Sequence, residues 1–177
     1  MANNKDKSKK RLRSPRPVGA LSRDTLPLQE SMRSGSDLSC ALIGGAAMEN
    51  MLMYVLERFL VDCEESKDLF DIKGDLDSIT KCKRMAFCLG LIDRLSYKNI
   101  GMVARIRNKF AHNHEPIDFK NEEIVGMCND LELNDPTGKE FGHLNAREKF
   151  CTVVSGEWER MFINGISTER RVELGKS

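Results

Sequence analysis

Apolar residues with helical spacing at positions 38–61 are the feature that most constrains how this sequence can fold. Ser36 or Asp37 provides a suitable N-cap, and apolar side chains then recur every three or four residues. The alternation of apolar and polar residues that marks strands does not persist anywhere in the chain. The sequence therefore predicts an all-α fold.

Other stretches have the lengths and end signals of helices. Asp77 or Ser78 can begin one and Gly90 can end it, while Asn145 and Glu148 can form a capping box at the start of the last. Four to five helices with short links predict an antiparallel bundle. Beyond the first helix, the predicted spans are 79–89, 97–111, 121–131 and 145–163, with a short helical turn at 26–32 and loops at 64–75 and 134–142.

The N-terminal segment differs from the rest in charge. Residues 1–16 contain seven Lys or Arg and one Asp, a net charge of +6, so residues 17–177 carry −5 of the total of +1. This segment lacks apolar periodicity and is predicted to be a disordered basic tail, which either holds nucleic acid or an anionic surface loosely or only aids solubility. A linker at 17–35, a helical domain at 36–165 and a C-terminal tail at 166–177 complete the predicted organisation.

Cysteine usage and hydropathy predict a reduced, cytoplasmic protein. The longest apolar run is Cys40–Met48, too short to span a bilayer, and no secretory signal follows the charged N-terminus. The six cysteines form no CxxC pair and lie mostly among apolar residues, which is typical of buried thiols rather than of a zinc site. We therefore expect no metal, no cofactor and no membrane contact.

Two charged residues lie on predicted apolar helix faces. Glu49 falls within the face of Leu38, Leu42, Met53, Leu56 and Leu60, and Arg107 falls within that of Ile100, Val103, Ala104 and Ala111. Unpaired buried charges are costly, so Glu49 and Arg107 are predicted to approach each other as a buried ion pair or to line one cleft.

The segment around Arg107 concentrates polar chemistry. Asn108 follows the arginine, His112 and His114 come within seven residues, and Pro116 bars the helix from continuing. On an ideal helix His114 lies close to Arg107 in rotation and His112 lies further round, so spacing alone does not choose between the two histidines.

These residues resemble two related groups of proteins. Arg107 to His112 fits the R-x4–6-H motif of the HEPN superfamily, including the polar residue after the arginine. The stretches at 41–43, 46–50, 85–92 and 105–112 resemble the mannitol-operon repressor family, and the resemblance covers Leu38–Leu131. It implies a helical bundle that dimerises across the motif face.

The resemblance also implies site residues. Arg107 and His112 would be catalytic, with Asn108 as a supporting polar residue and Glu49 as an orienter. His114 fits the longer form of the motif and would be auxiliary.

Two functions follow from these residues. The first is a metal-independent endoribonuclease, a stress, phage-defence or toxin-type effector with an antitoxin partner, in which histidine moves the 2′-hydroxyl proton and arginine holds the phosphate. The second is a non-catalytic transcriptional regulator that works through protein or nucleic-acid contacts. No helix-turn-helix signature is visible, and the net acidity of residues 17–177 weighs against broad nucleic-acid binding.

Overall fold

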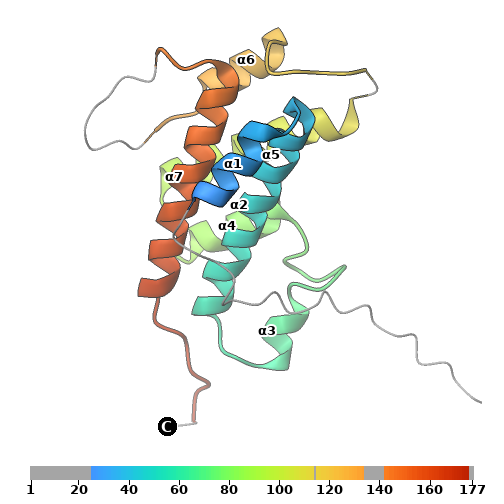
Figure 1. Ribbon diagram of the computed structural model, residues 1–177. Helices are drawn as coiled ribbons and strands as arrows, with labels where there is room; N and C mark the ends of the chain where they lie inside the picture. The colour runs from blue at the N-terminus through green and yellow to red at the C-terminus, as the bar shows by residue number, and fades with distance from the viewer. Residues whose placement is uncertain (1–24, 114, 134–141, 176–177) are drawn as a thin grey trace, which may run out of the picture.

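The computed structural model describes residues 25–113, 115–133 and 142–175, and these contain seven helices and no strand (Figure 1). The prediction of an all-α helical bundle is confirmed, and short helices raise the count above four to five. The predicted basic tail and residues 17–24 of the predicted linker lie outside the described residues. The helices are α1 (Leu26–Ser34), α2 (Asp37–Phe59), α3 (Glu64–Asp68), α4 (Ile79–Cys88), α5 (Arg94–His112), α6 (Glu122–Asn129) and α7 (Ala146–Ser167).

Local capping chemistry sets several helix ends where the sequence predicts them. The sequence allows Ser36 or Asp37 as the N-cap of α2, and Asp77 or Ser78 as the N-cap of α4. In the structure the serine is the N-cap of both helices. Asn145 and Glu148 form the predicted capping box of α7. Gly90, just after α4, has a φ of +72°, a conformation that glycine adopts without strain. These ends need only neighbouring residues, which is why the sequence predicts them.

Two short helices fall where the sequence predicts a linker or a loop. α1 occupies the end of the expected linker, where the sequence predicts a short helical turn at 26–32, and packs on α2 and α7, with the side chain of Met32 fully buried. α3 forms one short helical segment within the expected loop at 64–75. Both elements are too short to be stable alone, so tertiary contacts decide that they form.

α2 is the central helix and contacts α1, α4, α5 and α7. Among the described helices it alone has the length and composition to cross a membrane, in a window with a mean hydropathy of 1.3, of which 61% is buried inside the protein. The core helix of a water-exposed bundle has the same properties. The cytoplasmic location predicted from the sequence stays a prediction.

The predicted apolar face of α2 is only partly right. Met53 and Leu56 are buried, but Leu38 is 45% exposed and Leu42 is 38% exposed. The N-terminal half of α2 buries small residues instead, among them Cys40 and Gly44. Small side chains lie on this buried face because α7 approaches α2 closely there.

α2 and α7 lie side by side and run in the same direction (Figure 1). A Cβ on Gly44 would lie 2.6 Å from Cε1 of Phe150, so this glycine lets the ring of an early α7 residue sit against early α2. Further along both helices, Gly165 of α7 has no room for a Cβ beside the ring of Tyr54 of α2. The predicted antiparallel arrangement is therefore wrong for this pair, because the chain returns to the top of α2 through α5 and α6 before α7 begins.

Replacing Gly44 tests this packing. Gly44→Ala should lower the free energy of unfolding by about 1–2 kcal/mol, because overpacking against the fully buried Phe150 ring outweighs the better helix propensity of alanine. Gly156→Ala is the matched control: an added Cβ in α7 meets nothing within 4 Å there, so stability should rise by about 0.5–1 kcal/mol. Urea denaturation measures both changes, and equal shifts would contradict the close α2–α7 contact.

Candidate functional site

Arg107 faces the helix next to its own. Its aliphatic stem packs on Gly45, where a Cβ would lie 2.6 Å from Cγ of the arginine. Because Gly45 is early in α2 and Arg107 is late in α5, these two helices run in opposite directions, as predicted for the bundle. The guanidinium Nη1 donates a hydrogen bond to Oδ1 of Asn108 at 2.8 Å. The structure thus brings Arg107 and Asn108 together.

His112 lies on a different face of α5. It is the last residue of the helix and is exposed. Five residues of helix separate it from Arg107, so the two side chains leave the axis about 140° apart. His114 lies outside the described residues. Within one chain, the two residues predicted to be catalytic are therefore not directed at a common point.

Glu49 lies on α2 one helical turn after Gly45, so it sits on the side of α2 that meets α5 near Arg107. Both Glu49 and Arg107 are only partly buried. The structure therefore contains no fully buried ion pair between Glu49 and Arg107. That the two charged groups lie close together stays a prediction. Partial exposure lowers the expected cost of removing either charge.

Two adjoining hollows form a groove along α5, here called the α5 groove. One hollow, of about 620 Å³, is lined by Arg105, Asn108, Lys109, His112, Asn113, Glu123 and Met127. The other, of about 750 Å³, lies between α4, α5 and the segment after α6. Arg105 and Asn108 line both hollows, which joins them into one groove.

The cations of the α5 groove differ in how they are paired. Lys109 lies 2.6 Å from Glu123, and Lys98 lies 3.8 Å from Glu132, so these two charges are largely compensated. Arg105 is exposed and makes no ion pair or hydrogen bond with any part of the chain that the structure describes. Arg105 is therefore the groove cation best placed to receive an anionic group.

Lys83 of α4 is the second groove cation without a carboxylate partner among the described residues. Its Nζ lies 4.0 Å from the centroid of the Tyr97 ring, a cation–π contact. Gly101 leaves room for it, since a Cβ there would lie 2.7 Å from Nζ. Burial, with a smaller effect of Arg84, lowers the pKa of Lys83 below its ordinary value. An anion in the groove would favour the charged form of this amine.

A buried polar cluster fixes one wall of the groove. Asn99 of α5 donates to the backbone carbonyl of Glu132 at 2.8 Å and accepts from the amide of the same residue at 3.1 Å. It also donates to Oε1 of Glu157 on α7 at 2.7 Å, and both Asn99 and Glu157 are 2% exposed. This cluster ties the segment after α6 to α5 and α7, so the groove does not depend on loop conformation alone.

The sequence prediction missed Arg105 and Lys83. Arg105 precedes Asn108 by three residues and His112 by seven, which places all three on one side of α5 within about 60°. That spacing is visible in the sequence, but the R-x4-H motif indicates Arg107 instead of Arg105. Lys83 carries no such signal, because its position depends on how α4 packs on α5.

No group of three or more His, Cys, Asp or Glu side chains that could hold a metal ion occurs in residues 25–113, 115–133 and 142–175. The α5 groove offers amide, ammonium, guanidinium and imidazole groups beside three carboxylates, of which those of Glu123 and Glu132 are paired with lysines. The guanidinium, ammonium and amide groups among them are suited to binding an anion.

Comparison with known proteins identifies a family for this chain. A family model described as mannitol repressor matches residues 54–153, more than half of the chain. The match begins later than the predicted resemblance and extends into α7, and it contains every residue of the α5 groove. No curated protein and no solved structure matches the chain.

Proposed function

The chain belongs to the mannitol repressor family, and from this premise we propose that it is a non-catalytic transcriptional regulator. The observation that carries the proposal is the α5 groove, in which Arg105 faces outward without a partner among the described residues. The family description suggests that the regulated genes serve mannitol use. Such a regulator acts in the cytoplasm.

The groove is better suited to an acidic segment of a protein than to a long nucleic acid. Lys98 and Lys109 are already paired with glutamates, which leaves Arg105 and Lys83 as the available cations. Affinity for a nucleic-acid backbone requires many such cations, and residues 17–177 carry a net charge of −5. Two cations with an adjoining amide, Asn108, match one or two carboxylates of a protein partner.

A metal-independent endoribonuclease of the HEPN type is the second candidate. It is favoured by the Arg107–Asn108 hydrogen bond and by the position of Asn108 in the same groove as His112. Because Arg107 and His112 face different directions, such a site would need two copies of the chain. The exposed Leu38 and Leu42 of α2, on the helix that contacts Arg107, offer an apolar surface for this homodimer.

One experiment separates the two candidates. Purified full-length protein is incubated with total RNA in EDTA, and transcript levels are compared between cells with and without the protein. We expect the RNA to stay intact and transcription from a defined set of promoters to rise when the protein is absent. RNA fragments that end in 2′,3′-cyclic phosphate, and that disappear with Arg107→Ala, would reject the regulator and support the nuclease.

A further inference from the structure

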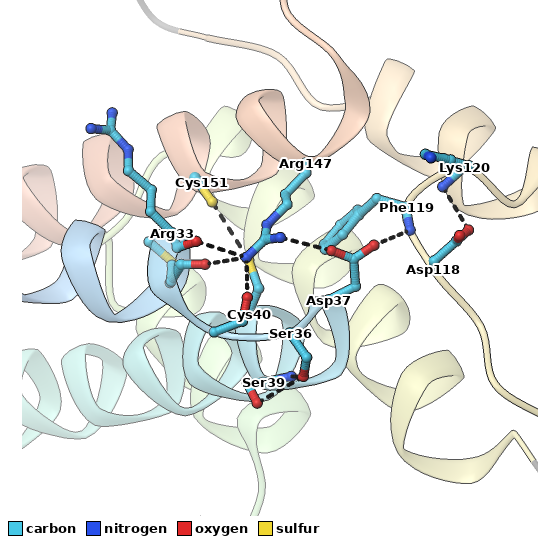
Figure 2. A network of polar contacts seen from close by, with 12 residues as sticks. Arg33, Ser36, Asp37, Ser39, Cys40, Asp118, Phe119, Lys120, Arg147 and Cys151 are labelled. Carbon is cyan, nitrogen blue, oxygen red and sulfur yellow. Dashed lines mark hydrogen bonds and ion pairs between the residues drawn. The ribbon is translucent and has the colours of Figure 1, made fainter.

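Two cysteines that are far apart in the sequence meet between α2 and α7. The sulfur atoms of Cys40 and Cys151 lie 3.5 Å apart, and one thiol hydrogen-bonds the other (Figure 2). The contact forms one turn before Gly44 and one residue after Phe150, where the two helices approach closely. Two sulfurs at this separation need to approach by only about 1.5 Å to reach the length of a disulfide bond.

The two thiols have different surroundings. Cys40 is fully buried, whereas Cys151 is 7% exposed and lines a cavity of about 650 Å³. Ser155, one turn further along α7, lines the same cavity, and its hydroxyl has no hydrogen-bond partner among the described residues. Of the two thiols, Cys151 is therefore the one that a small molecule in this cavity can approach.

Electrostatics favour a thiolate at Cys151. The hydrogen bond from Cys40 and the positive charge of Arg147 hold the pKa of Cys151 below its ordinary value, although burial opposes them. The same hydrogen bond and burial raise the pKa of Cys40. Figure 2 shows Arg147 beside both sulfurs. The exposure of Cys151 to the cavity and the full burial of Cys40 distinguish the attacking thiol from the resolving thiol.

We propose that Cys40 and Cys151 form a redox-active pair, which a hydroperoxide closes into a disulfide between α2 and α7. The Cys151 thiolate attacks one peroxide oxygen, the O–O bond breaks, and the released alkoxide takes up the proton that the thiol lost. The sulfenic acid at Cys151 is then attacked by the sulfur of Cys40, the S–O bond breaks, and water leaves with the second thiol proton. The two thiols together lose two electrons, and the peroxide gains them.

The disulfide would covalently join the first long helix to the last. It encloses the chain from residue 40 to 151, a large loop, so its formation should raise the thermal midpoint of unfolding by several degrees. It also lies beside Arg147, which holds the junction of α1 and α2. Oxidation would therefore fix this end of the bundle, a change that a reductant reverses.

Peptide mapping of the full-length protein tests the proposal. The reduced protein is treated with hydrogen peroxide in small excess, then denatured in N-ethylmaleimide and digested without reductant. We expect a cross-linked peptide containing Cys40 and Cys151, and a fall in reactive thiols from six to four. Replacing Cys63 and Cys88 with serine removes the more exposed thiols and should leave the cross-link in place.

Two variants and one condition act as controls. Cys151→Ala should abolish the cross-link, whereas Cys128→Ala should keep it, because burial raises the pKa of the Cys128 thiol to about 12. In urea, the unfolded chain should give mixed disulfides instead of one pair. The proposal is overturned if Cys40 and Cys151 are recovered as separate maleimide adducts after Cys88 has oxidised, or if either residue pairs with Cys128.

Discussion

Replacing Arg147 with alanine should lower the free energy of unfolding by about 3 kcal/mol, because one side chain holds several elements together. Its guanidinium lies 2.9 Å from Oδ1 of Asp37 and donates to the backbone carbonyls of Met32, at 2.8 Å, and of Gly35 (Figure 2). These carbonyls lie at the C-terminal end of α1, where backbone carbonyls have no N–H partner within the helix. Asp37 in turn accepts from the amide of Phe119 at 2.9 Å, so the loop before α6 depends on the same ion pair.

Urea denaturation and thermal melting measure the change, and the midpoint should fall by about 6–12 °C for a chain of this size. Arg147→Lys should lose part of the stability, because an ammonium keeps the charge but not the planar fork of donors. Arg33→Ala is the control, since its exposed side chain makes no hydrogen bond or ion pair in the described part of the chain. If Asp37→Ala and Arg147→Ala were strictly additive in the double variant, the two residues would not share one interaction.

Arg105→Ala should weaken repression by about ten-fold or more, the effect of losing about 1.4 kcal/mol of partner binding. Arginines at the centre of an interface are frequent hot spots, and the outward-facing Arg105 is the groove cation with no internal partner among the described residues. The measurement is a reporter gene under the regulated promoter, in cells that contain the variant as their only copy. Because Arg105 is exposed, the stability of the variant should match that of the wild type.

Arg84→Ala is the matched control for Arg105→Ala. Arg84 is also an exposed cation, on α4 next to Lys83, but it does not line the α5 groove. Repression should be unchanged by its removal. The opposite outcome would be normal repression by Arg105→Ala and lost repression with Arg107→Ala. That outcome would reject the α5 groove as the partner-binding surface and would favour the R-x4-H motif as the functional site.

The candidate site was only partly predictable from the sequence. The sequence concentrates polar side chains around Arg107, and Asn108 and His112 of this segment line the α5 groove in the structure; their role as site residues stays a prediction. The choice of Arg107 as the partner of His112 came from a sequence motif rather than from helix geometry. The structure turns the stem of Arg107 onto Gly45, because a glycine on the facing helix leaves space for it.

By itself, the sequence determined the all-α class and most helix ends. Caps such as Ser36, Ser78 and Asn145 act on backbone amides within three residues, so their effect is local and visible in the sequence. Tertiary structure decided which faces meet. The parallel contact of α2 with α7 and the pairing of Cys40 with Cys151 both join residues more than one hundred positions apart. No local rule specifies such contacts, because they depend on how every helix packs on α2 at once.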